Sequence, residues 1–347
     1  MSNNDGKRSG NALNSFQYIV VIIVLVAVIA CAVCFVVFNN KYSPSGNTQT
    51  EKKQTETEKK EETTKDMEYE ETLPPETESK ALDRNYTSVK LTAEDMHKGS
   101  AILVSSVYPY VFPEKDNLVS IYSNKSKTYV LSTTKHLLDK EALEALNNLM
   151  DDFANASNNT DCIIVDAYRT KEEQQEKYDN YVKKYGEKDA VGKVAKAGES
   201  DFQTGYTFDV KAYSDHTVKV INNDPDYVWL IENCHKYGFV ERFPESKKEA
   251  TGTDYEGGLC LRYVGISNAY IMHEKNLCLE EYVMQLNDYK FNGEHLSVTT
   301  ADGKTFEAYS AKMEKGDQSI DVFVPADIPY SVSGNNVNGF IISYEVK

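Results

Sequence analysis

Apolar and polar positions divide the chain into five parts. Residues 18–38 form an apolar run without charge, glycine or proline, which is long enough to span a bilayer core of roughly 30 Å. Residues 39–83 consist mainly of Thr, Glu and Lys, a composition that buries too little apolar surface to order the chain. We therefore expect a cytoplasmic tail at 1–17, a transmembrane helix at 18–38, a disordered stalk at 39–83, a folded domain at 84–286 and a small β-rich module at 287–347.

Helical and strand periodicities alternate within residues 84–286, which predicts an α+β domain. A stripe of apolar residues at helical spacing predicts a helix from 139 to 154; its members are Leu138, Ala142, Leu146, Leu149 and Phe153. Another helix is expected from the N-cap and first-turn proline at 224–225 to Gly238. The remaining expected elements are strands at 101–107, 118–122, 162–166 and 261–264 and helices at 171–185 and 279–283.

After residue 287 the pattern changes to short alternating runs separated by turn residues. The tetrapeptide Ala-Asp-Gly-Lys at 301–304 lies between two such runs and predicts a β-hairpin. Apolar runs at 320–324 and 339–344 continue the same pattern. We interpret this region as a small β-rich appendage without a recognisable catalytic set.

Charge and cysteine content narrow the function classes. The formal net charge of −16 argues against a nucleic-acid partner, because phosphate binding needs clustered Lys and Arg. Lys7 and Arg8 precede the apolar run, so we expect the N-terminus in the cytoplasm and the body outside. A lipidated N-terminus at Cys31 is the alternative anchor. The cysteines of the body match no zinc-knuckle spacing, and their pairing is left open; they are Cys162, Cys234, Cys260 and Cys278.

Four segments of the body carry a family resemblance. They are Ala167–Thr170 with Gln174, Gly198–Val210, Tyr237–Gly252 and Tyr255–Gly265. In this order they resemble the motifs of the VanY-type D-alanyl-D-alanine carboxypeptidases, zinc enzymes that trim peptidoglycan stem peptides. The resemblance covers about residues 86–283. It implies a VanY-like α+β domain, with a small antiparallel sheet flanked by helices, acting outside the cytoplasm on stem peptides or beside a cell-wall enzyme.

The zinc site of that family is only partly present. Its mechanism uses His, Asp and His as ligands, an open fourth position for water and a carboxylate base. Asp209 stands at the Asp position, whereas Phe202 and Cys260 stand at the two His positions. The base position falls on Gly257, and Glu256 would serve as the catalytic residue only after a one-residue insertion. A phenyl ring has no lone pair for a metal, so the resemblance implies a degenerate site for which no cofactor is expected.

A remodelled zinc site is the alternative. Cys and Asp are both zinc ligand types, so Asp209 and Cys260 would supply half of a site. A third ligand would have to come from Asp201, Glu256 or His216, and no spacing selects one of them. If no metal binds, Cys260 is a buried strand residue and Phe202 fills the vacated pocket.

The substrate-binding positions of the family are better retained. Arg169, Gln174 and Ser200 match residues that line the family's cleft. A guanidinium group can hold a carboxylate through two parallel hydrogen bonds, which suits the end of a peptide. A structural ion pair between Arg169 and Asp166 is the competing interpretation.

Three functions remain open. The first is a membrane-tethered, extracytoplasmic carboxypeptidase-like protein that binds stem peptides or regulates a wall enzyme without hydrolysis. The second is an active metallo-carboxypeptidase with a remodelled zinc site. The third is a non-catalytic structural surface protein that makes its contacts through residues 287–347.

Overall fold

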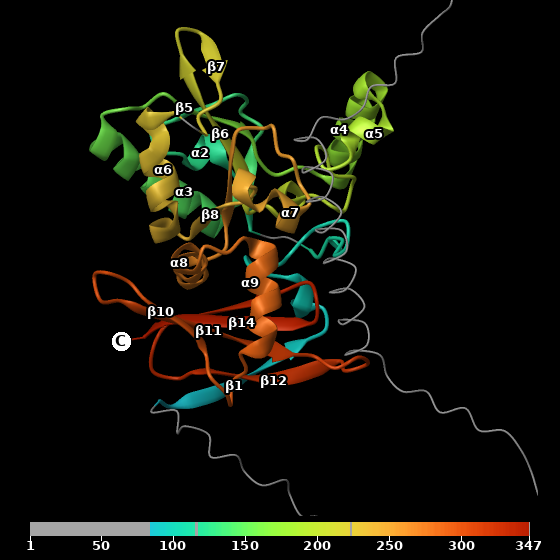
Figure 1. Ribbon diagram of the computed structural model, residues 1–347, viewed down its shortest axis with the longest axis vertical. Coiled ribbons are helices and arrows are strands. Elements are labelled where there is room, and N and C mark those ends of the chain that lie inside the picture. The colour runs from blue at the N-terminus through green and yellow to red at the C-terminus, as the bar shows by residue number, and fades with distance from the viewer. Residues whose placement is uncertain (1–83, 115–116, 223, 347) are drawn as a thin grey trace, which may run out of the picture. The chain divides into compact units, whose positions relative to one another are not determined.

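The computed structural model describes residues 84–114, 117–222 and 224–346, shown in colour in Figure 1. These residues fall within one compact unit. The expected tail, transmembrane helix and stalk at 1–17, 18–38 and 39–83 lie outside the described residues. Within the described ranges, no helix has both the length and the apolar character needed to cross a bilayer.

The central sheet is built around strand β6, which carries Asp209. Its strands run in the order β3 (Val130–Leu131), β5 (Cys162–Asp166), β6 (Thr207–Ser214), β9 (Leu259–Tyr263) and β8 (Phe239–Glu241), with β7 (Thr217–Lys219) paired to β6. All pairs are antiparallel except β3 with β5, which is parallel. The sheet is therefore mixed at one edge, where the sequence predicted an antiparallel sheet throughout.

Helix α3 (Lys140–Ser157) packs against this sheet and contains the predicted stripe except Leu138, which lies in strand β4 (Leu137–Asp139). Its buried residues are Ala142, Leu143, Leu146, Leu149, Met150 and Phe153, and they share a core with β5, β6 and β9. The Asp139 side chain caps the helix by accepting a hydrogen bond from the Glu141 N–H at 2.9 Å. The predicted helix is confirmed and ends at Ser157, with Asn158 in the left-handed conformation after it.

The remaining helices surround the sheet or follow it. They are α2 (Ile121–Asn124), α4 (Lys171–Tyr185), α5 (Glu187–Ala190), α6 (Val228–Asn233), α7 (Lys248–Thr251), α8 (Ile266–Lys275) and α9 (Leu279–Gln285). Short 3-10 turns lie at η1 (Asp95–His97), η2 (Asp201–Thr204), η3 (Pro225–Tyr227), η4 (Cys234–Tyr237), η5 (Glu245–Lys247) and η6 (Leu286–Asp288). The helix predicted from 224 to Gly238 is thus divided into η3, α6 and η4. Helix α8 was not predicted.

The predicted strand at 101–107 is wrong. Residues 101–104 are buried, but side chains rather than a neighbouring strand bind their carbonyl groups. Arg262 donates to the Ile102 carbonyl at 3.1 Å, and Asn336 donates to the Leu103 carbonyl at 2.9 Å. The predicted strand at 118–122 is shorter than expected: β2 (Leu118–Ser120) pairs with β4 (Leu137–Asp139) and then leads into α2.

The C-terminal module is a four-stranded antiparallel sheet with a separate two-stranded ribbon. The sheet has the order β10 (Leu296–Thr299), β11 (Thr305–Lys312), β14 (Gly339–Val346) and β13 (Tyr330–Gly334), and the predicted hairpin at 301–304 joins β10 to β11. In the ribbon, β12 (Ser319–Pro325) pairs with β1 (Tyr86–Thr92). The module therefore includes a strand from the beginning of the folded body. Helices α8 and α9 share a core with β10, β11 and β14 (Figure 1).

Candidate functional site

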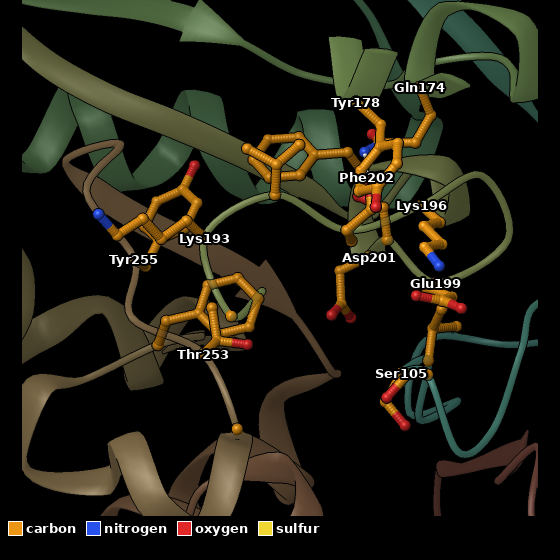
Figure 2. A pocket seen from close by; sticks show the side chains of 18 of the residues that line it. Ser105, Gln174, Tyr178, Lys193, Lys196, Glu199, Asp201, Phe202, Thr253 and Tyr255 are labelled. Carbon is orange, nitrogen blue, oxygen red and sulfur yellow. Dashed lines mark hydrogen bonds between the residues drawn. The ribbon is translucent and has the colours of Figure 1, made fainter. Parts of the chain in front are cut away.

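A pocket of about 420 Å³ opens beside the sheet and is lined by the three predicted substrate-binding residues and by Phe202. Its walls come from α4, from the chain between α5 and η2, from residues 251–255 and from residues 104–106. Figure 2 shows Gln174, Tyr178 and Phe202 on one wall and Thr253 and Tyr255 on another. Residues 104–106 lie outside the four motif segments, and no sequence motif placed them at this site.

Arg169 lines the pocket but is already bound by its neighbours. Its Nε and Nη2 donate to the two oxygens of Asp166 at 3.0 and 3.1 Å, and its Nη1 donates to Gln174 Oε1. Lys177 adds a second cation to Asp166 at 2.7 Å. Burial raises the pKa of Asp166, but the two cations outweigh it and hold the pKa below its usual value. The ion pair that the sequence offered as a structural role for Arg169 is therefore formed.

The other two predicted substrate-binding residues also line the pocket. Gln174 is 1% exposed; besides accepting from Arg169, it donates through Nε2 to the Ala195 carbonyl at 2.5 Å. Both ends of its amide are engaged, so Gln174 joins α4 to the chain before η2. Ser200 is also buried and immediately precedes η2.

Phe202 occupies the first position predicted for a metal ligand, and its ring forms part of the pocket wall. The side chain is 3% exposed, and the Arg169 guanidinium carbon lies 4.0 Å from the ring centroid. The Arg169 backbone N–H also donates to the Phe202 carbonyl at 3.1 Å. A cation stacked on an aromatic face is an attractive arrangement, so Phe202 is held in place from two directions. Gly205, with φ of 80°, then turns the chain into β6.

Asp209 and Cys260 are brought together, as the sequence predicted for the remaining half of a metal site. They are register partners on β6 and β9 and are 3% and 1% exposed. The Tyr255 hydroxyl donates to Asp209 Oδ2. Within the part of the chain that the structure describes, Oδ1 has no hydrogen-bond partner beyond the adjacent thiol, a weak donor. Burial raises the pKa of Asp209 to about 6 and the pKa of the Cys260 thiol well above its usual value.

Neither predicted position for the carboxylate base provides one. A side chain at Gly257 would collide with the Tyr255 ring, which folds back over this glycine to reach Asp209. The Glu256 side chain is 67% exposed and pairs with Lys193 at 3.3 Å, so it is engaged outside the predicted metal site. Tyr255 therefore occupies the space in which the family would place its base.

The three candidates for a further metal ligand lie elsewhere. Asp201 is bound on one oxygen by Arg242 Nε at 2.9 Å and on the other by Arg262 Nη1. His216 is an exposed residue in the turn between β6 and β7, and Glu256 is engaged with Lys193. Among the described residues, no group of three His, Cys, Asp or Glu side chains is placed to hold a metal ion. The residues present do not fit a zinc ion, and the remodelled site lacks its third ligand.

A second cluster of charged side chains, Asp201, Arg242 and Glu280, lines another part of the pocket. Arg242 also forms two hydrogen bonds to Glu280 of α9, at 3.0 and 2.7 Å. Arg262 donates to the carbonyls of Ser100 and Ile102 at 2.9 and 3.1 Å. Two buried arginines thus join η2, β9 and α9 to the segment that begins at residue 100. Asp201, expected only as a possible metal ligand, therefore has a structural role that no residue spacing indicated.

Three comparisons place these features in a wider context. Residues 135–266 match the family described as VanY, D-alanyl-D-alanine carboxypeptidase. A D-alanyl-D-alanine carboxypeptidase of Enterococcus faecium is 29% identical over 281 residues, which are 79% of this chain and 84% of the relative. One of Enterococcus faecalis is 37% identical over 130 residues, which are 35% of this chain and 47% of the relative.

A solved structure supports the same fold. The vancomycin resistance D,D-dipeptidase VanXYg, crystallised with a D-Ala-D-Ala phosphinate analogue, superposes with a TM-score of 0.65 at 24% identity. The match covers 76% of this chain and 100% of that one. It shows the VanY-like α+β fold, which the motif segments predicted. The family match and the Enterococcus faecium relative support the resemblance to the VanY-type D-alanyl-D-alanine carboxypeptidases that the motif segments predicted.

Proposed function

We propose that this protein binds peptidoglycan stem peptides without hydrolysing them and without a zinc ion. One observation carries the proposal: Phe202 and Tyr255 fill the positions of a metal ligand and of the base, while the pocket beside them remains open. Zinc-dependent cleavage needs a coordinated water and a carboxylate that can take its proton. Among the described residues no group of three ligands is placed to hold a metal ion, Gly257 carries no carboxylate, and Glu256 is paired with Lys193.

The interior contacts explain why the altered site is stable without a metal. Burial without a cation raises the pKa of a carboxylate, and the pKa of Asp209 is raised in this way. Burial also raises the pKa of Tyr255 and of Cys260, so both neighbours of Asp209 stay protonated at neutral pH. These three side chains and Phe202 form a packed interior in which Asp209 is the group that titrates closest to neutral pH. The open part of the pocket retains polar and basic side chains that suit a peptide end, among them Ser200 and Lys196.

We further propose that residues 18–38 anchor the protein in the cell membrane, with the N-terminus in the cytoplasm and the folded body outside. The support is the uncharged apolar run in the sequence and the family's link to stem peptides. Tagging residues 1–17 and 339–347 and digesting intact cells with protease would test this arrangement. Protection of the N-terminal tag and loss of the C-terminal tag is the expected result; the reverse pattern would rule it out.

Three measurements on one preparation of the full chain test the binding function. After incubation with zinc and desalting we expect no bound zinc, no D-alanine release from a pentapeptide ending in D-Ala-D-Ala, and saturable binding of that peptide by calorimetry. About one zinc per chain together with D-alanine release would replace the proposal with an active metallopeptidase. Absence of binding would leave a structural surface protein.

A matched pair of variants localises the binding. Thr253→Trp places a large side chain on the pocket wall, whereas Thr299→Trp makes the same change at an exposed position on β10. We expect the first variant to lose at least about tenfold in affinity, equivalent to 1.4 kcal/mol, and the second to bind like the wild type. Equal binding by both variants would place the peptide outside this pocket.

A further inference from the structure

We propose that Lys177 and Lys196 recognise the free terminal carboxylate of the bound peptide, and that Arg169 is a positioning residue. This inference rests on the proposed function, because it concerns the same pocket and the same ligand. It replaces the sequence-based prediction in which the Arg169 guanidinium binds the peptide end.

The contacts of Arg169 leave it poorly placed to accept a ligand. All three of its side-chain nitrogens already donate to Asp166 or Gln174. One face of the guanidinium lies against the Phe202 ring, and the side chain is only 11% exposed. A bidentate bond to a peptide carboxylate would require Asp166 to give up the edge formed by Nε and Nη2. Arg169 instead holds Gln174 and Phe202 in position.

Lys177 gives the ion-pair cluster of Asp166, Arg169 and Lys177 a net positive charge. Asp166 contributes one negative charge, whereas Arg169 and Lys177 contribute two positive charges, so the group has a net charge of +1. Lys177 lines the pocket, its side chain is 44% exposed, and its ammonium lies 5.9 Å from the Phe202 ring centroid. An ammonium has three N–H donors, and only one is needed for the contact with Asp166.

Lys196 supplies a second cation on the same wall. Its ammonium lies 5.6 Å from the ring centroid of Tyr178, the residue that follows Lys177 on α4, and both Lys196 and Tyr178 line the pocket (Figure 2). Among the described residues, no carboxylate lies within 4.0 Å of the Lys196 ammonium, although Glu187 and Glu199 line the same pocket. Lys193, by contrast, pairs with Asp189 and Glu256.

This arrangement predicts a particular selectivity. An ammonium acts as a compact point charge and does not demand the planar, two-oxygen geometry that a guanidinium fork prefers. The pocket should therefore select peptides by the negative charge at their end. A stem peptide that ends in a free carboxylate should bind, and the same peptide capped as a primary amide should bind weakly.

The test compares a D-Ala-D-Ala pentapeptide acid with its C-terminal amide, using the full chain at low ionic strength. For the wild type we expect the acid to bind about tenfold more tightly than the amide. Lys177→Met and Lys196→Met should each reduce this preference to about threefold or less. Lys188→Met, on α5 and outside the pocket lining, is the matched control and should retain the full preference.

Arg169→Lys separates positioning from recognition, because it keeps the net charge of the cluster and removes the guanidinium contacts to Gln174 and the Phe202 ring. We expect this variant to weaken binding of the acid and the amide by the same factor, so the preference for the acid stays. Loss of the preference in Arg169→Lys, with retention in both lysine variants, would return recognition to the guanidinium and overturn the inference. Thermal unfolding of each variant identifies any that does not fold, and either lysine variant alone suffices for the comparison.

Failure of the inference is distinguishable from failure of the proposed function. If wild-type protein binds the acid and the amide equally, the lysine inference is wrong and peptide binding stands. If wild-type protein binds neither form, the proposed function is wrong and the inference falls with it.

Discussion

Two buried aspartates of this protein have the same exposure and opposite environments. Asp201 and Asp209 are both 3% exposed and lie at the two ends of one motif segment. Asp201 is bound by two arginines, whereas Asp209 has a phenol and a thiol beside it and no cation in contact among the described residues. A buried carboxylate needs a compensating charge or must give up its own. The comparison therefore separates an acid held by two cations from an acid that is buried without one.

The largest effect is expected on the Asp201 side. Arg242→Met should cost about 3–5 kcal/mol of unfolding free energy, because it leaves Asp201 and Glu280 with one fewer cation in a buried setting. Urea unfolding at neutral pH measures the change. Lys248→Met removes an exposed pair with Asp254 and serves as the control, with a cost within about 1 kcal/mol. If Arg242→Met lowers the unfolding free energy no more than Lys248→Met does, the arginine pairing of Asp201 does not stabilise the fold as proposed.

Rebuilding the lost ligands should convert the Asp209 side into a metal site. The triple change Phe202→His, Cys260→His and Tyr255→Phe supplies two imidazoles beside Asp209 and removes the phenol that now donates to it. With zinc at about 100 times its dissociation constant, binding should add about 2.7 kcal/mol of stability. Wild-type protein should show no such gain in the same titration. A wild-type gain equal to the variant's would mean that the native residues already hold the metal.

Removing the charge at Asp209 should stabilise the protein modestly. Asp209→Asn keeps the shape of the side chain but cannot ionise, so at pH 7.5 it avoids the cost of a buried carboxylate without a cation. We expect a gain of about 1–2 kcal/mol in urea unfolding. Asp201→Asn is the matched variant and should lose stability, because two arginines then lack their shared anion. A loss from Asp209→Asn similar to that from Asp201→Asn would make the two acids equivalent.

A buried histidine that contacts neither aspartate gives the smallest and most pH-dependent effect. Burial, with help from His273 stacked at 3.6 Å and from Lys236, lowers the pKa of His235 to about 4. The unfolded chain takes up this proton near pH 6.5, so the stability contributed by neutral His235 is lost as the pH falls from about 6.5 to about 4. His235→Phe should reduce the acid-side loss by about 1 kcal/mol. The exposed His216, changed to Ala, should leave the stability profile as it is.

Much of the fold was predictable because its signals are local. The apolar stripe of α3 repeats at helical spacing, and Thr170 with Glu173 forms a capping box at the start of the charged helix α4. The replacement of a ligand by Phe202 was equally clear, since a ring carbon cannot bind a metal whatever the surrounding structure. The proximity of Asp209 and Cys260 was implied by the family resemblance, which placed both residues at metal-ligand positions.

What was not predictable depends on contacts between distant parts of the chain. The turn of Tyr255 back over Gly257 depends on the path of a glycine-rich loop, which no residue spacing encodes. The binding of Asp201 by Arg242 and Arg262 joins residues from three segments. The pairing of β1 with β12 spans more than 200 positions, and alternating apolar residues in two strands do not specify which strand each will meet.

That last pairing determines how the folded body would respond to force. Strand β1 is the first described strand, so a pull transmitted through the preceding residues reaches the body at Tyr86. The seven register pairs from Tyr86 with Pro325 to Thr92 with Ser319 then share the load along the strand axis. Hydrogen bonds perpendicular to that axis resist together when strands are pulled past one another. A tether at this end would therefore strain the β1–β12 ribbon first, before the force reaches the sheet that carries the pocket.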